Sequence, residues 1–216
     1  MNYKLVIFDL DGTLLNTIAD LSDAVNHALK LRGLPQHSLE EITKMVGHGV
    51  RNLITQALPA ELRDDQTALE TTLADFTAYY KAHIDAHTLP YPGIQELIST
   101  LNSKGIKMAV ASNKFQEGTE YLIAEFFPNI PFVAVLGNRP DFPLKPDPEI
   151  VNEVLRKSGV KREEAVMVGD SPTDMKTAAN GGIVGIAVGW GYRNMRGIEG
   201  LTVAETADEL QKLILQ

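Results

Sequence analysis

Apolar runs alternate with stretches of helical spacing from residue 94 to residue 188, and this alternation restricts the possible folds more than any other feature of the chain. We expect strands at 107–111, 132–136, 165–168 and 182–188, and helices at 94–104, 117–127, 149–157 and 174–180. A chain that alternates strands with helices forms parallel strands joined by right-handed crossovers. The sequence therefore predicts an α/β fold with a parallel sheet.

A further apolar run, residues 3–8, ends in two carboxylates, Asp9 and Asp11, followed by Gly12 and Thr13. A charge at the end of a buried strand is costly unless it lies in a crevice or is neutralised. In open α/β sheets that crevice is where ligands bind. By itself the pattern is equally typical of an ordinary turn, because Asp and Gly favour turns. The position of Asp9 nevertheless makes it a candidate for a functional site.

Residues 16–89 show helical spacing without a convincing strand. Ser38 and Glu41 have the spacing of a capping box that begins a short helix. A longer helix is expected over 66–87. The sequence therefore predicts a helical domain at 16–89, inserted after the first strand into a core domain formed by residues 1–15 and 90–216.

Bulk properties exclude several classes of function. The net charge of -8 argues against a nucleic-acid partner, which needs clustered Lys and Arg. The chain contains no cysteine, which excludes disulfides, thiolate metal sites and a cysteine nucleophile. No apolar run approaches the ~20 residues that span a bilayer, and the N-terminus lacks the features of a secretory signal. We expect a cytoplasmic protein without nucleic-acid or membrane partners.

Three later segments carry further polar side chains: Ala-Ser-Asn-Lys at 111–114, Leu-Lys-Pro-Asp-Pro at 144–148 and Val-Gly-Asp-Ser-Pro-Thr-Asp at 168–174. The first and the third stand at the ends of expected strands, and the second precedes an expected helix. With residues 9–13, and in this order, they resemble the signature of the haloacid dehalogenase superfamily of aspartate-dependent phosphohydrolases. The resemblance implies a Rossmann-like core, and it implies that the helical insert is a cap that closes over the active site and excludes water.

The resemblance also implies the reaction. Asp9 corresponds to the carboxylate that attacks the phosphoryl group, and Asp11 to the general acid/base. Four carboxylates at one sheet edge need a cation, and oxygen ligands suit Mg²⁺. We expect the side chains of Asp9 and Asp170 and the carbonyl of Asp11 to bind Mg²⁺ directly, and Asp174 to act directly or through water.

Ser112 and the backbone amide of Asn113 are expected to donate hydrogen bonds to the phosphoryl oxygens. Lys145, as the only cation of the four motifs, is expected to pair with Asp9 and with the phosphate. Without the motif order, a Ser-Asn pair at a strand end would be read as structural and a lysine in a turn as a surface residue. Thr13 is expected to form a local hydrogen bond.

The substrate is expected to be a small phosphorylated metabolite. Within the superfamily, residues 46–51, 145–148 and 189–192 resemble the bacterial branch that acts on 2-phosphoglycolate. His48 and Arg51 stand beside glycines that interrupt the helical pattern, and Arg suits a substrate carboxylate, although an exposed helix arginine without a role is equally typical. A sugar phosphate, pyrophosphate or nucleotide substrate, a phosphomutase, and a non-catalytic phosphate-binding relative are the alternatives.

Overall fold

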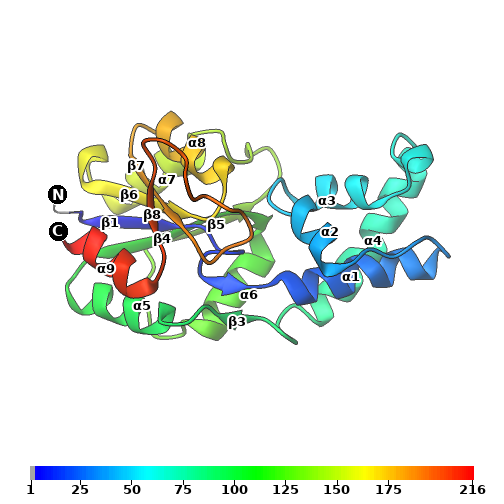
Figure 1. Cartoon of the computed structure of the whole chain (residues 1–216), viewed down its shortest axis with the longest axis horizontal. Helices are drawn as coiled ribbons and strands as arrows, with labels where there is room; N and C mark the ends of the chain where they lie inside the picture. Colours follow the sequence, from blue (N-terminus) through cyan, green and yellow to red (C-terminus); the bar gives the residue numbers. More distant parts are fainter. Residues whose placement is uncertain (1–2) are drawn as a thin grey trace. The chain divides into compact units, whose positions relative to one another are not determined.

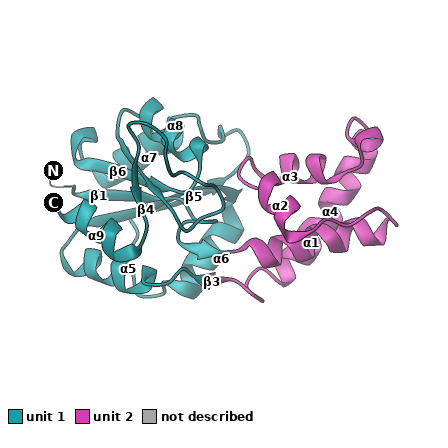
Figure 2. Cartoon of the chain, in the orientation of Figure 1, with its two compact units in different colours: residues 1–16, 90–216 teal, residues 17–89 magenta. Residues whose placement is uncertain are grey.

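The computed structural model describes residues 3–216 and divides the chain into two compact units (Figures 1 and 2). One unit comprises Met1–Asn16 and Pro90–Gln216, and the other comprises Thr17–Leu89. The first unit contains a six-stranded sheet and the second contains helices.

The sheet of the first unit has the strand order β5-β4-β1-β6-β7-β8, and every neighbouring pair is parallel. Its strands are β1 (Leu5–Phe8), β4 (Lys107–Phe115), β5 (Ala134–Asn138), β6 (Ala165–Gly169), β7 (Val184–Val188) and β8 (Thr202–Ala204). β1 lies between β4 and β6 and is buried along its whole length. Its last residue, Phe8, pairs with Val110 of β4 on one side and with Val168 of β6 on the other. The predicted α/β fold with a Rossmann-like parallel sheet is confirmed.

Helices cover both faces of this sheet, with α7 (Glu149–Ser158) and α8 (Pro172–Asn180) on one face, and α5 (Ile94–Ser103) and α9 (Ala207–Leu215) on the other (Figure 1). Side chains of a strand alternate between the two faces. Leu5 and Ile7 of β1 therefore join the core beneath α7 and α8. The apolar side of α7 contributes four side chains to that core: Ile150, Val151, Val154 and Leu155. Burying such a side chain contributes about 1.5–3 kcal/mol.

Two parts of this unit differ from the sequence prediction. β4 was expected to end at Ala111 but continues to Phe115, and its register against β5 shifts between these two residues. The strand therefore includes the polar motif that was expected to follow it. β8 and α9 lie beyond residue 188, where no element was predicted. α9 nevertheless begins at a capping residue, because Thr206 accepts a hydrogen bond from Glu209 N. Two further helical elements of the unit are α6 (Gln116–Phe126) and the 3-10 turn η2 (Arg162–Glu164).

The second unit contains α1 (Ile18–Leu31), α2 (Leu39–Met45), α3 (Val50–Ala57), a 3-10 turn η1 (Ala60–Leu62) and α4 (Gln66–Ala82). The predicted capping box of Ser38 and Glu41 is present at the start of α2. α4 ends five residues earlier than expected. The buried Asp20 of α1 accepts hydrogen bonds from the backbone N–H groups of His87 and Thr88, so these two residues bond to a side chain instead of continuing the helix.

Two short strands, β2 (Leu15–Asn16) and β3 (Leu89–Pro90), form a separate two-stranded sheet. The expectation that residues 16–89 contain no strand is therefore wrong at its two ends. Among residues 3–216, no helix combines the length and hydropathy that a membrane span requires.

Candidate active site

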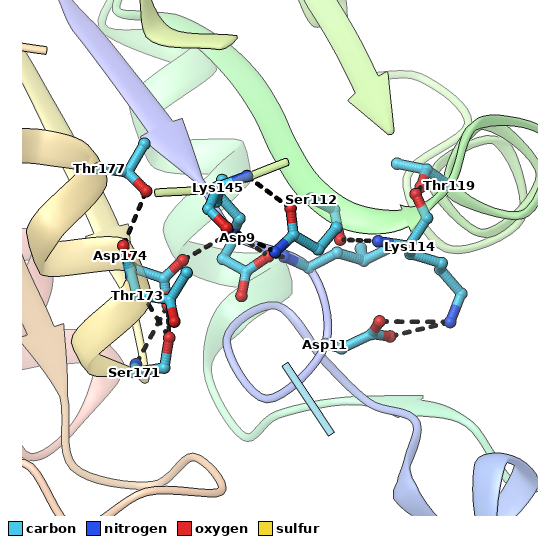
Figure 3. A network of polar contacts seen from close by, with 12 residues as sticks. Asp9, Asp11, Ser112, Lys114, Thr119, Lys145, Ser171, Thr173, Asp174 and Thr177 are labelled. Carbon is cyan, nitrogen blue, oxygen red and sulfur yellow. Dashed lines mark hydrogen bonds and ion pairs between the residues drawn. The ribbon is translucent and has the colours of Figure 1, made fainter. Parts of the chain in front are cut away.

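The four motifs meet at the carboxyl ends of three neighbouring strands. Asp9 follows β1, Ser112 lies near the end of β4, and Asp170 follows β6. Because β1 pairs in parallel with both β4 and β6, these ends lie at the same edge of the sheet. Figure 3 shows the resulting network of carboxylates, lysines and hydroxyls.

A tight turn after β1 holds the first motif in place. The backbone N–H groups of residues 13–15 all donate to the carbonyl of Leu10. Gly12 has φ +84°, which only glycine adopts readily. A Cβ atom at Gly12 would also lie 2.5 Å from Oδ2 of Asp170. The glycine is therefore required both by the turn and by the close approach of the fourth motif.

Lys145 connects two of the acidic motifs. Its Nζ lies 2.8 Å from Oδ1 of Asp9 and 2.7 Å from Oδ1 of Asp174, and its side chain is 2% exposed (Figure 3). Burial by itself lowers the pKa of Lys145, but the Asp174 and Asp9 carboxylates together outweigh it and raise that pKa above its ordinary value. Lys145 is therefore a fixed positive charge beside Asp9.

The backbone of Lys145 is held by the second motif. Lys145 N donates to Oδ1 of Asn113 at 2.8 Å, and Nδ2 of Asn113 donates to the carbonyl of Lys145 at 3.2 Å. The peptide bond from Lys145 to Pro146 is cis. The side chain of Asn113 thus positions the lysine, a contact that the sequence did not indicate.

Asp174 is engaged at both carboxylate oxygens. Oδ1 accepts a hydrogen bond from Lys145 Nζ, and Oδ2 accepts hydrogen bonds from the backbone N and the Oγ of Ser171, at 3.1 and 2.6 Å (Figure 3). The bond from Ser171 N, together with a bond from Asp174 N to Ser171 Oγ, forms a capping box at the start of α8. Asp174 is therefore a structural partner of Lys145 as well as a member of the acidic cluster.

Asp9, Asp170 and Asp174 form a buried group in which one oxygen from each carboxylate lies within 4.8 Å of the others. Burial and the Asp174 carboxylate raise the pKa of Asp9 well above its ordinary value, and Lys145 only partly opposes this. Burial and the Asp174 carboxylate also raise the pKa of Asp170 to about 7, and a hydrogen bond from Tyr192 N partly opposes this increase. The cluster thus holds more negative charge than Lys145 offsets.

Such a group suits a hard divalent cation, because all its donors are carboxylate oxygens. It offers neither the nitrogen nor the sulfur ligands of a typical zinc site. Since both oxygens of Asp174 already have partners, Asp9 and Asp170 are better suited to direct contact with the ion. The residues present therefore fit Mg²⁺.

Asp11 pairs with a second buried lysine. Nζ of Lys114 lies 3.1 Å from Oδ1 and 3.3 Å from Oδ2 of Asp11 (Figure 3). The side chain of Lys114 is 2% exposed and that of Asp11 is 15% exposed. The expectation that Lys145 is the only cation of the motifs is therefore wrong. Lys114 stands in the second motif, but the sequence does not show where its side chain points.

Oγ1 of Thr13 is buried and has no hydrogen-bond partner among residues 3–216, so the predicted local hydrogen bond of this hydroxyl is wrong. The backbone carbonyl of Thr13 instead accepts a hydrogen bond from Trp190 Nε1 at 3.1 Å. The same loop contributes Tyr192, whose N–H donates to Oδ2 of Asp170 at 2.7 Å. The 189–192 segment thus supports two motifs, a role that the sequence did not indicate.

Tyr91 is a further residue near the site, and no sequence motif pointed to it. Burial, together with the Asp170 and Asp11 carboxylates, raises the pKa of its phenol above the ordinary value. Its ring centroid lies 6.4 Å from that of Trp190. Its neighbours in the sequence are prolines and a glycine, which suggested only a turn.

His48 and Arg51 belong to the helical unit. His48 is exposed in the loop between α2 and α3. Arg51 is exposed in the first turn of α3, and its Nη1 donates to Oε1 of Glu70 on α4 at 2.7 Å. The guanidinium thus has a carboxylate partner within its own unit.

Comparisons with known proteins agree with this arrangement. The family model described as haloacid dehalogenase-like hydrolase matches residues 6–188. A phosphoglycolate phosphatase from Mesorhizobium japonicum is 35% identical over 213 residues, which cover 97% of this chain and 94% of the relative. Phosphoglycolate phosphatase 1 from Pseudomonas aeruginosa is 32% identical over 213 residues, covering 98% of this chain and 78% of the relative.

A crystal structure from Lactobacillus delbrueckii subsp. bulgaricus superposes with a TM-score of 0.91 and 35% sequence identity, and the alignment covers 100% of this chain and 99% of the other. The superposition extends over the whole length, and the family model spans the sheet from β1 to β7. The chain therefore belongs to the haloacid dehalogenase-like hydrolase family.

Proposed function

We propose that this protein is a Mg²⁺-dependent phosphatase that hydrolyses 2-phosphoglycolate through a phosphoaspartate at Asp9. The observation that carries the proposal is the buried pair of Asp9 and Lys145 at the end of β1, with the carboxylate of Asp11 two residues further on. A nucleophile, a fixed cation and a second carboxylate are the groups that stepwise phosphoryl transfer needs.

The reaction begins at Asp9. Its Oδ1 accepts hydrogen bonds from Leu10 N and Lys145 Nζ, and Oδ2 is assigned the role of nucleophile. As Oδ2 bonds to phosphorus, the bond from phosphorus to the leaving oxygen breaks, and that oxygen keeps the electron pair and takes a proton from Asp11. Water then attacks the phosphoaspartate, Asp11 takes a proton from it, and inorganic phosphate leaves with Asp9 restored.

Three groups orient the phosphoryl oxygens in this proposal. Lys145 offsets their negative charge. Oγ of Ser112 accepts a hydrogen bond from Lys114 N, so its own proton can be donated to the phosphate. The backbone N–H of Asn113 is the third donor, and the side chain of Asn113 holds Lys145.

Asp9, Asp170 and the carbonyl of Asp11 would hold the Mg²⁺ ion. When bound, the ion supplies positive charge that offsets the carboxylates and the transferring phosphoryl group. Asp174 contributes through Lys145 and Ser171, because both its oxygens already accept hydrogen bonds. Tyr192 keeps Asp170 in position through its backbone N–H.

The choice of 2-phosphoglycolate is supported by the names of the relatives that match nearly the whole chain. In this proposal the helical unit is a cap, and Arg51 with His48 binds the substrate carboxylate. Arg51 would exchange an exposed partner, Glu70, for that carboxylate. The cytoplasmic location expected from the sequence stays a prediction.

The proposal is tested by measuring free phosphate released from a panel of esters in the presence of Mg²⁺. The panel contains 2-phosphoglycolate, sugar phosphates, nucleotides and pyrophosphate. The highest kcat/KM is expected for 2-phosphoglycolate. A clear preference for a sugar phosphate or a nucleotide would retain the chemistry and overturn the substrate, and no hydrolysis of any ester would overturn the function.

A further inference from the structure

The pair formed by Asp11 and Lys114 connects two segments that are fixed independently. Asp11 belongs to the turn whose N–H groups converge on the carbonyl of Leu10. Lys114 belongs to β4, where its own N–H donates to Ser112 Oγ and its carbonyl accepts from Thr119 Oγ1 (Figure 3). The two side chains therefore meet because the backbones beneath them are held in place.

The ammonium of Lys114 lies almost symmetrically between the two oxygens of Asp11, at 3.1 and 3.3 Å. The terminal torsion of an aspartate is broad, so its carboxylate can rotate unless side-chain contacts hold it. A cation in contact with both oxygens fixes the plane of the group.

Stability alone does not account for this lysine. A buried ion pair is often no more stabilising than apolar side chains of similar volume, because both charges lose their hydration. Asp9 and Asp174 already share Lys145. The charge of Lys114 is instead directed at the one carboxylate that the proposed reaction uses to transfer protons.

We propose that Lys114 is a positioning residue for Asp11: it orients the carboxyl group toward the leaving oxygen and acts on the reaction only through that group. The inference rests on the proposed function, since it assigns to Lys114 a part in the same reaction. It predicts that Lys114 affects only those esters whose leaving oxygen needs a proton.

The test measures kcat/KM of Lys114→Met and of the wild-type protein on three substrates. This parameter reports the steps up to transfer of the phosphoryl group to Asp9. Two are alkyl esters, 2-phosphoglycolate and 2-hydroxyethyl phosphate, of which only the first carries a carboxylate. The third, 4-nitrophenyl phosphate, has a leaving group that departs without protonation. Its hydrolysis also reports whether the variant is folded.

Lys114→Met should lower kcat/KM for both alkyl esters by roughly tenfold to a hundredfold, because part of the rate enhancement from general acid catalysis is lost. The kcat/KM for the aryl ester should stay within about twofold of the wild-type value. Equal losses on all three substrates would overturn the positioning role. A loss confined to 2-phosphoglycolate would also overturn it, because Lys114 would then bind the substrate carboxylate. If the wild-type protein hydrolyses none of the three, the proposed function itself fails.

A double-mutant cycle separates an effect through Asp11 from a direct one. In an Asp11→Asn background, Lys114→Met should lower kcat/KM for the alkyl esters no further, whereas a direct contact with substrate would lower it again. Lys114→Gln gives the same comparison if the Met variant does not fold. Lys107→Met is the matched control, because Lys107 begins the same strand and its Nζ donates to the carbonyl of Ser158. It should leave all three substrates unchanged.

Discussion

Nζ of Lys145 lies 2.8 Å from Oδ1 of Asp9, although the two residues stand 136 positions apart in the chain. Both side chains are buried, and the contact forms because Asn113 holds the backbone of Lys145 beside the end of β1. The pair places a permanent positive charge next to the carboxylate that is proposed to attack phosphorus.

Asp9→Asn should abolish phosphate release while the protein stays folded, because an amide oxygen does not replace a carboxylate as nucleophile. Free phosphate and the far-UV circular dichroism spectrum are the measurements. Asp147→Asn is the matched control: Asp147 belongs to the same motif as Lys145, and Asn can replace its hydrogen bond to Glu149 N. Phosphate release by folded Asp9→Asn protein at the wild-type rate would contradict the assignment.

Removal of divalent cations should abolish turnover, and Mg²⁺ should restore it. Ca²⁺ should not substitute, because it is larger and accepts a less strict geometry. Mg²⁺ should also raise the Tm of the wild-type protein but not that of Asp170→Asn. Asp141→Asn, at an exposed position with φ 59° where Asn is well tolerated, should respond to Mg²⁺ as the wild type does. Full activity in excess chelator would rule out a metal requirement.

Lys145→Met should lower the free energy of unfolding by about 3–5 kcal/mol in chelator, since it leaves two buried carboxylates without their cation. Adding Asp174→Asn to this variant should recover part of the loss, because one of the two unpaired charges is then absent. Urea denaturation of both single variants and the double variant measures this coupling. Additive losses would mean that Lys145 and Asp174 do not stabilise each other.

Arg51→Ala should lower kcat/KM for 2-phosphoglycolate roughly tenfold or more and leave a carboxylate-free aryl phosphate largely unaffected, as expected when a charged hydrogen bond to substrate is lost. Glu70→Gln is the control, because it removes the partner of Arg51 in α4 and leaves the guanidinium in place. It should keep the activity on both substrates. Equal losses on both substrates in Arg51→Ala would indicate a general role in cap closure instead.

The sequence by itself determined the α/β class and the part of the sheet at which the motifs meet. Alternating strands and helices lead to a parallel sheet, and the carboxyl ends of parallel strands lie at one edge. Asp9, Ser112 and Asp170 could therefore be placed together from their positions at strand ends. The helix start at Ser38 was equally local, because a capping box involves only four residues.

Apart from the pair of Lys145 and Asp9, which the family resemblance implied, only the tertiary structure decided which polar groups contact one another. Lys114 reaches Asp11 because β4 continues past Ala111 with a shifted register, and no periodic pattern shows such a shift. The contact of Asp174 with Lys145 and that of Tyr192 with Asp170 depend likewise on segments far apart in the chain. Hydrophobic spacing reports which face of an element is buried, whereas the partner of a charged side chain depends on how separate elements pack.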